Sequence, residues 1–163
     1  METVIRPITE ADVPGYHRCL DIVARERRFL AFREAPPIER SLAFVRGQIA
    51  GGAPMFVAAH GDHIVGWCDI SPQSCPSLAH RGDLGMGVHP DHRGHGFGRR
   101  LLQAALSAAH ACGLERVELA VITSNAPAIA LYRSAGFEIE GTIRHAQKLD
   151  DGYADDYLMA LFL

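Results

Sequence analysis

The feature that most constrains the fold is a glycine-rich run between a strand and a helix. In "HRGHGFGRRLL" the glycines Gly94, Gly96 and Gly98 alternate with other residues, arginines flank them, and apolar residues at helical spacing follow. A helix N-terminus has backbone N–H groups without partners and a partial positive charge, and glycines let a bulky anion approach them. The run therefore predicts a strand–loop–helix unit that binds a phosphate-bearing ligand.

Length and composition restrict the class of protein. The 163 residues, of which 48% are hydrophobic and 21% charged, suit a single globular domain spanning 1–163. A net charge of −3 argues against a protein that binds nucleic acid by neutralising phosphates. The absence of a long apolar run or a signal-peptide pattern argues against a membrane and predicts a cytoplasmic protein. Cys19, Cys68, Cys75 and Cys112 form no C-x-x-C pair and are expected to be buried or half-buried free thiols.

Hydrophobic periodicity and turn residues predict an alternation of strands and helices. The expected order is a strand at 4–8, a helix starting at Thr9–Asp12 and reaching Leu30, a helix at 37–50, a hairpin turning at Gly61-Asp62, a strand at 82–90, a helix at 96–112, a strand at 114–122, a helix at 124–136, and strands at 137–147 and 153–162 joined by the turn "LDDG". This order predicts the α/β (α+β) class, with a mixed central sheet of about seven strands flanked by about four helices.

Two common phosphate-binding loops do not fit the glycine run. A Walker A loop requires Lys followed by Ser or Thr after its glycines, and neither pair occurs here. A dinucleotide-binding fingerprint requires a third glycine where Arg99 stands, although Glu115 has the spacing of its ribose-binding acid. The hairpin that precedes the loop also does not suit a doubly wound parallel sheet.

Two motifs together resemble the GNAT acetyltransferase superfamily. "RGHGFG" (93–98) matches its R/Q-x-x-G-x-G/A signature, and "NAPAIALYRSAGF" (125–137) is similar to its N-x-x-A-x-x-L-Y-x-x-x-G-F signature. The resemblance covers essentially the whole chain and implies acetyl-CoA as co-substrate, with no metal. It implies that the pyrophosphate lies on the glycine loop, whose residues are Arg93, Gly94, His95, Gly96, Phe97, Gly98 and Arg99.

The resemblance also assigns roles around the thioester. The strand "LGMGV" resembles the family's bulged strand, whose N–H groups around Met86, Gly87 and Val88 contact the pantetheine arm. Gly85 and Gly87 fit such a bulge, or they serve only close packing. Asn125 is expected to bind the pantetheine arm, to cap the helix, or both. Tyr132 is the expected general acid near the sulfur, with core packing as the alternative.

The general base is less constrained. Glu118 and Asp83 are the candidates, each acting through a water, and solvent is the third possibility. Protein-N-terminal alanine acetyltransferases, which this chain resembles in N-x-x-A-I-A-L-Y, carry Glu where Ala120 stands. The histidines His89, His92 and His95 have a spacing that a metal site can use, but no acidic residue supports them, so exposed loop positions are expected.

The sequence thus predicts an acetyl-CoA-dependent N-acetyltransferase of a primary amine on a small molecule, with an amino acid among the candidates. The C-terminal segment 139–163 is similar to the branch that acetylates amino acids and other small amines. The alternatives are a protein N-terminal acetyltransferase and a CoA-binding sensor with little turnover. The expected partner is the small-molecule amine, and a homodimer is possible. Binding to nucleic acid or to a membrane is not expected. The acceptor pocket is assigned to the segments 28–39, 72–80 and 148–156.

Overall fold

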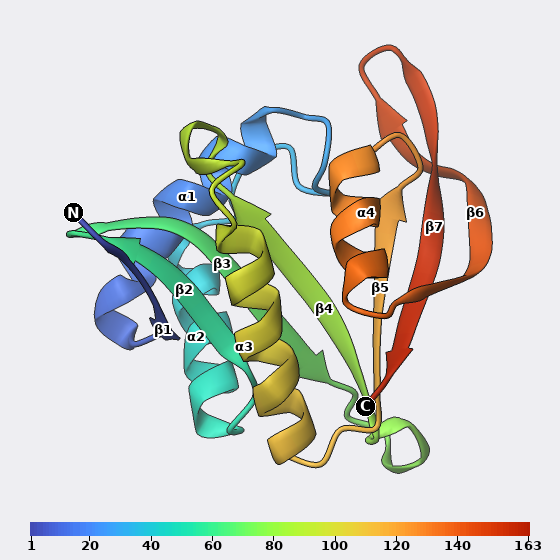
Figure 1. Ribbon diagram of the computed structural model, residues 1–163. Coiled ribbons are helices and arrows are strands. Elements are labelled where there is room, and N and C mark those ends of the chain that lie inside the picture. The colour runs from blue at the N-terminus through green and yellow to red at the C-terminus, as the bar shows by residue number, and fades with distance from the viewer.

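Seven strands form one sheet with helices on both faces in the computed structural model, which describes residues 1–163 (Figure 1). The strands are β1 (Thr3–Pro7), β2 (Met55–His60), β3 (His63–Pro72), β4 (Arg81–Val88), β5 (Arg116–Ile122), β6 (Glu138–Leu149) and β7 (Gly152–Phe162). The helices are α1 (Val13–Arg25), α2 (Ile38–Ala50), α3 (Phe97–Ala111) and α4 (Ala126–Ser134). The predicted mixed sheet of about seven strands and four helices is confirmed.

The sheet is divided where β4 meets β5. The strand order is β1-β2-β3-β4-β5-β7-β6, and β4–β5 is its only parallel pair. That pair holds from Arg81↔Arg116 to Asp83↔Glu118 and no further. Beyond it the two strands diverge (Figure 1), so the later part of β4 has an edge without a strand partner.

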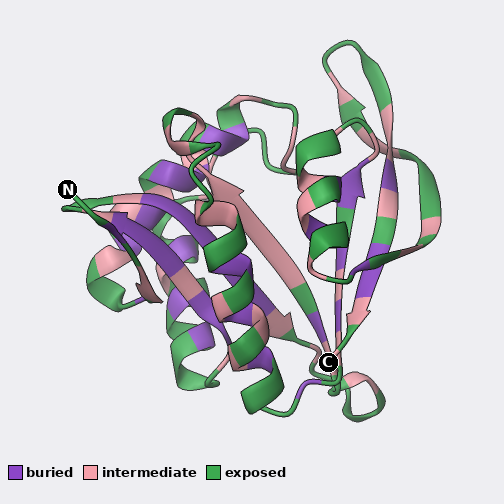
Figure 2. Cartoon of the chain, viewed as in Figure 1, coloured by how far each residue is buried: buried purple, intermediate pink, exposed green.

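Each face of the sheet packs its own core (Figure 2). Cys68 and Ile70 of β3 lie in the larger core with α3 and α4, whereas Trp67 lies in the smaller core with α1. The ring of Tyr16 on α1 meets Trp67 edge-on, with centroids 5.8 Å apart. Because successive side chains of a strand point to opposite faces, Asp69 lies on the same face as Trp67.

The first helix ends earlier than its apolar pattern predicts. α1 stops at Arg25 rather than Leu30, because Arg27 adopts a left-handed conformation with φ 55°. The Asp21 carboxylate then holds the returning chain by accepting the Ala35 N–H at 2.9 Å. Leu30 still packs on the smaller core, as a helical position would have done.

The bulge expected in β4 is absent from its pairing with β3, and that prediction is wrong. The register runs without a shift from Gly66↔Val88 to Pro72↔Gly82. A Cβ at Gly87 would lie 2.3 Å from Cη2 of Trp67, so this glycine makes room for the indole ring. The packing alternative for these glycines is therefore the correct one.

Smaller expectations are met or corrected. The turn at Asp150-Asp151 joins the last two strands, as "LDDG" predicts, and β6 continues two residues past the expected end. All four cysteines are free, but Cys75 and Cys112 are exposed rather than buried. None of the helices combines the length and the apolar character needed to cross a membrane.

Candidate active site

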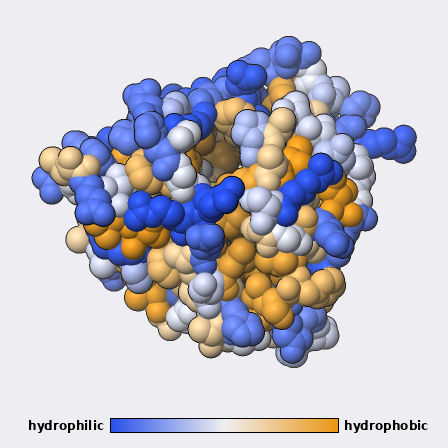
Figure 3. All heavy atoms as spheres, viewed as in Figure 1, coloured by the Kyte–Doolittle hydropathy of each residue, from blue (hydrophilic) through white to orange (hydrophobic).

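The gap between β4 and β5 exposes a stretch of backbone in the middle of the protein. Met86, Gly87 and Val88 lie on β4 beyond its last pair with β5 and are half-buried. Their side facing β5 has no strand to bond to. The Val88 carbonyl accepts from Nε of Arg93 at 2.9 Å, and the other backbone groups on this side are free to pair with a bound molecule. Figure 3 shows the surface hollowed here, beside the end of β4 and between the start of α3 and α4.

The glycine loop turns the chain from β4 into α3. Gly94 and Gly96 both have φ 79°, a conformation that side chains rarely adopt. Gly96 caps α3 without a side-chain hydrogen bond, and the first turn has no acidic residue. The Arg100 N–H donates to the Gly96 carbonyl at 3.1 Å, so the three N–H groups before it have no partner in the helix. They are the backbone groups to which the glycine run assigns the anion.

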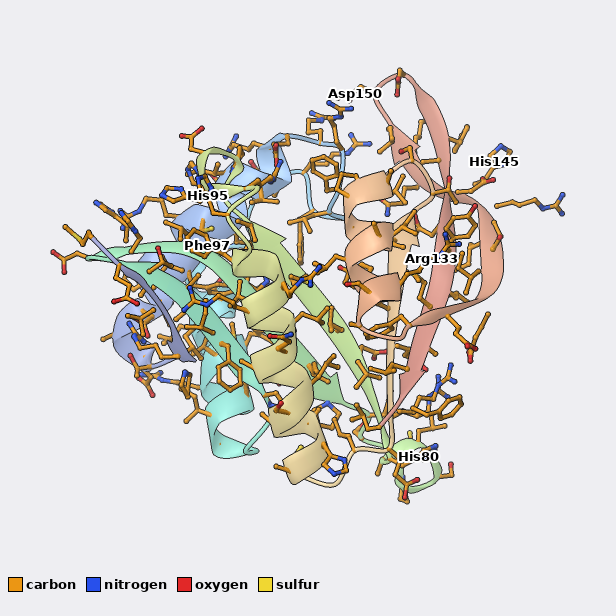
Figure 4. The ribbon with its side chains drawn as sticks, in the orientation of Figure 1. His80, His95, Phe97, Arg133, His145 and Asp150 are labelled. Carbon is orange, nitrogen blue, oxygen red and sulfur yellow. The ribbon has the colours of Figure 1, made fainter.

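Side chains around the loop hold it in place. Arg93 pairs with Glu26 at 2.6 Å, donates through Nε to the Val88 carbonyl at 2.9 Å, and lies over the Phe29 ring. His95 stacks on Phe97 with centroids 5.9 Å apart, and Figure 4 places both at the start of α3. Arg93 thus fixes the loop to the end of α1. No group of three His, Cys, Asp or Glu side chains is arranged to hold a metal ion.

The second motif forms α4, which borders the gap. The Asn125 side chain caps this helix by accepting the Ala128 N–H at 3.3 Å. Tyr132 is buried, and burial raises its pKa well above the ordinary range, with a further contribution from the Cys68 thiol. Cys68 lies opposite Met86 in the sheet, and Met86 packs against the same core as Tyr132. Its hydroxyl stays protonated at neutral pH, as a proton donor must.

The two predicted base candidates meet at the point where the strands separate. Asp83 of β4 and Glu118 of β5 are register partners and lie on the face that α1 covers over β3. Arg81 donates to Glu118 at 2.6 Å and Arg116 donates at 2.8 Å, and these bonds lower the pKa of Glu118. Burial and the charge of Glu118 raise the pKa of Asp83, which also accepts a hydrogen bond from Gln73. Both line a hollow of about 350 Å³.

A second hollow lies between the α1–α2 loop and the β6–β7 hairpin. It has a volume of about 290 Å³ and brings together two of the three segments assigned to the acceptor pocket. Arg27 pairs across it with Asp150 at 2.6 Å, and Arg33 donates to the Lys148 carbonyl at 3.1 Å. Figure 4 shows Asp150 at the tip of the hairpin. The segment 72–80 does not line this hollow.

Comparison with known proteins establishes the family. Residues 17–137 match the Acetyltransferase (GNAT) family. The chain belongs to the GNAT acetyltransferase family. It is therefore an N-acetyltransferase that uses acetyl-CoA as its donor.

Three curated relatives of this GNAT protein differ in substrate. The L-amino acid N-acetyltransferase AaaT of Escherichia coli K12 is 33% identical over 110 residues, which are 67% of this chain and 68% of AaaT. An L-methionine sulfoximine/L-methionine sulfone acetyltransferase of Pseudomonas paraeruginosa is 28% identical over 86% of this chain and 83% of its own. The ribosomal protein bS18 alanine N-acetyltransferase of E. coli is 42% identical over 47% of this chain and 51% of its own.

Solved GNAT structures share the whole fold. A GNAT acetyltransferase from Streptococcus pneumoniae superposes with a TM-score of 0.93 at 27% identity, covering 99% of this chain and 100% of the other. The yncA protein of Salmonella typhimurium, solved with acetyl-CoA, gives a TM-score of 0.93 at 21% identity, covering 100% and 95%. At that identity the second comparison supports the fold alone.

One buried carboxylate of this GNAT protein belongs to neither motif. Asp69 of β3 is buried on the α1 side of the sheet, and burial raises its pKa to about 7. The one signal in the sequence is a carboxylate inside the otherwise apolar strand "GWCDI" (66–70). Charged residues are almost never fully buried without a partner, so this position marks a site as well as a strand.

Proposed function

We propose that this GNAT protein transfers the acetyl group of acetyl-CoA to the primary amine of an amino acid or a related small molecule. The observation that carries the proposal is the juxtaposition of an uncapped α3 N-terminus with a free β4 edge. The first binds a pyrophosphate and the second binds an extended amide-containing arm. Relatives named for amino acids and for methionine sulfoximine support the acceptor class.

The donor site is assigned to the residues of the two motifs. The backbone from Arg93 to Arg99 holds the phosphates, and the edge of Met86 to Val88 pairs with the pantetheine arm and polarises the thioester carbonyl. The side-chain oxygen of Asn125 accepts the Ala128 N–H at the start of α4, which leaves the side-chain NH₂ group to donate to the same arm. These assignments rest on the family motifs together with the free backbone groups described above.

Tyr132 acts as the general acid in the proposed reaction. The neutral amine attacks the thioester carbon, the C–N bond forms, and the C–S bond breaks. The Tyr132 hydroxyl gives its proton to the departing thiolate, which makes it a better leaving group. On the acceptor side, Asp83 and Glu118 are the base positions that the sequence offers, and Glu118 is the weaker because two arginines already stabilise its charge.

The acceptor is proposed to enter by the hollow between the α1–α2 loop and the β6–β7 hairpin. Three cationic side chains, Arg27, Arg33 and Lys148, line it, and only Arg27 is paired with an acid there. Such a site suits the carboxylate of an amino acid, which a guanidinium binds in bidentate fashion. This favours a free amino acid over the N-terminus of a protein chain, because the α-carboxyl group of a protein's first residue is part of a peptide bond and carries no charge.

The test combines binding with turnover. Calorimetric titration measures acetyl-CoA affinity, and a thiol-release assay then measures acetylation of L-amino acids, L-methionine sulfone, and a peptide with the N-terminal sequence of protein bS18. Turnover confined to amino acids or the sulfone supports the proposal. Turnover of the peptide alone supports the protein N-terminal alternative, and tight binding without any turnover supports the sensor alternative.

A further inference from the structure

We propose that Asp69 of β3 binds the ammonium group of the acceptor and takes its proton before the amine attacks the thioester. The inference rests on the proposed function and names the group that receives the substrate amine. Neither family motif contains this residue.

Asp69 is a buried carboxylate without a partner in the protein. Only two carboxylates are buried, Asp69 and Asp156, with 8% and 7% of their surface exposed. Asp156 accepts hydrogen bonds from Nε2 of Gln147 at 3.2 and 3.3 Å. Asp69 has neither an ion pair nor a hydrogen bond, and burial alone shifts its pKa. Its oxygens are not among the fully enclosed polar atoms without a partner, which are Ser41 Oγ and His92 Nδ1, so the carboxylate still reaches solvent. A carboxylate that is largely buried, unpaired and reachable can bind a ligand.

The carboxylate lies directly over Gly85 of β4. Asp69 is the register partner of Gly85, and a Cβ at Gly85 would lie 3.3 Å from its Oδ2 atom. One step further along β4, the Trp67 ring fills the equivalent space over Gly87. Gly85 also lies beyond the last β4–β5 pair, next to the gap assigned to the thioester. The absence of a side chain at Gly85 therefore makes room for the carboxylate itself and places it next to that gap.

Asp69 and Tyr132 lie on opposite faces of the sheet, Tyr132 near Cys68 and Asp69 at the next position of β3. Cys68, which influences the pKa of Tyr132, is opposite Met86, and Asp69 is opposite Gly85. One face thus offers a protonated hydroxyl and the other offers a bare carboxylate. This arrangement suits acetyl transfer, because the ammonium must lose a proton and the leaving sulfur must gain one.

The protons balance over the reaction. The Asp69 carboxylate takes one proton from the ammonium, and the neutral amine forms the C–N bond as the C–S bond breaks. Tyr132 protonates the thiolate, and the second proton lost by the nitrogen restores the Tyr132 hydroxyl through water. The proton on Asp69 passes to solvent when the amide leaves, so the products are the amide, CoA thiol and one proton.

The surroundings of Asp69 suit this exchange. Burial raises its pKa to about 7, so the group is close to the range in which it gains and loses a proton readily. Tyr16 of α1 and Asp83 of β4 lie on the same face of the sheet as Asp69, whereas Cys68, the adjacent residue of β3, lies on the other face. Cys19 of α1 influences Tyr16 and is itself influenced by the cation Arg93, which is paired with Glu26. No cation is bonded to the Asp69 carboxylate, so an arriving ammonium is its first direct counter-ion and favours the ionised form.

The first test is the pH dependence of Asp69→Asn. With the best amino acid of the panel, kcat/KM at pH 7 should fall at least about 100-fold, the scale of a positioned base, while acetyl-CoA affinity stays unchanged. The loss should shrink as the pH approaches the pKa of the amine, because solution then supplies neutral amine. Asp62→Asn, at the exposed turn between β2 and β3, is the control and should match the wild type.

Two results would overturn the proposal in that experiment. One is wild-type kcat/KM in Asp69→Asn at pH 7. The other is a pH profile that Asp83→Asn or Glu118→Gln abolishes and Asp69→Asn leaves in place. Gly85→Ala adds a steric check, since its methyl group crowds the carboxylate and should raise the KM of the amine.

The second test does not depend on turnover. In protein labelled with carboxyl-¹³C aspartate and saturated with CoA, the Asp69 resonance, assigned by its loss in Asp69→Asn, should move when methylammonium is added. Tetramethylammonium has the same charge but no N–H to donate, so it should move the resonance less. An unmoved resonance, or equal movement by both cations, refutes the ammonium site. A specific response in a protein that acetylates no panel amine would instead refute the proposed function and retain the site.

Discussion

Tyr132 is the residue whose hydroxyl can be removed with least disturbance to the core. Tyr132→Phe keeps the ring against Phe137, with centroids 5.7 Å apart, and deletes only the proton donor. We expect acetyl-CoA affinity to persist while thiol release falls about 10- to 1000-fold, because the thiolate then leaves without a proton. Calorimetry and the thiol-release assay measure the two effects separately. Full activity in this variant would return Tyr132 to a packing role.

Asp12 is the carboxylate whose ion pair contributes to stability, with further hydrogen bonds from Thr9. Arg6 donates to both of its oxygens at 2.7 Å, and this pair lowers the pKa of Asp12 to about 2. A carboxylate with a lowered folded-state pKa stabilises the fold above its unfolded pKa of about 3.9 and loses that contribution as the pH falls through 2. We expect Asp12→Asn to reduce the free energy of unfolding by about 1 kcal/mol at pH 7.

The pH dependence separates this effect from a general packing defect. Urea denaturation of wild type and Asp12→Asn should give different midpoints at neutral pH and converging midpoints toward pH 2. A difference that is the same at both pH values would contradict the role of the ion pair.

Among the elements, the N-terminus of α3 is the most direct test of donor binding. Gly96→Asp places a side chain and a negative charge where the pyrophosphate is proposed to lie, so acetyl-CoA affinity should fall at least tenfold, or about 1.4 kcal/mol. Gly113, at the other end of α3, also has a positive φ and open space around its Cα. Gly113→Asp therefore imposes similar backbone strain and should leave the affinity unchanged. Equal affinities in both folded variants would refute the anion loop.

Tertiary packing explains why β4 contains glycines. Gly87→Ala forces a methyl group into the Trp67 ring, and such overpacking costs about 1–3 kcal/mol of folding stability. Trp67 is the only tryptophan, so its fluorescence reports the displacement directly. Gly141→Ala on β6 meets no neighbouring atom and serves as the control. An unchanged spectrum and midpoint in Gly87→Ala would show that the ring moves aside freely.

At the scale of the whole molecule, the last hairpin adds negative charge near the acceptor side. Asp156 is buried on β7, and Asp155 accepts the His145 N–H at 2.9 Å. We expect Asp155→Asn with Asp156→Asn to raise the KM of the amine, less so at high salt, because screening weakens the attraction of a cation. The KM of acetyl-CoA should not change. Asp62→Asn, at the opposite edge of the sheet, is the control, and a similar change in both KM values would point to a structural role instead.

The family, the element order and the loop that precedes α3 can all be predicted from the amino-acid sequence. These depend on local rules, namely periodicity, turn residues and helix capping, and on motifs whose spacing is fixed within a few residues. Local rules also explain the error at the end of α1, where an apolar pattern continued after the backbone had already turned at Arg27. The reversal depends on Asp21 binding the Ala35 N–H, which is a contact across 14 positions of the chain.

The contacts and pKa values of the site residues could be known only from the folded structure. The pattern "LGMGV" suggested a bulge, yet the glycines fit the Trp67 ring and the Asp69 carboxylate of the neighbouring strand. Glu118 had the residue type of a base, but arginines from two strands hold it as an ion pair. Asp69 carried no motif, and its role follows from burial without a partner. Such properties depend on residues distant in sequence, because a side chain's pKa and its free space are set by the neighbours that folding brings to it.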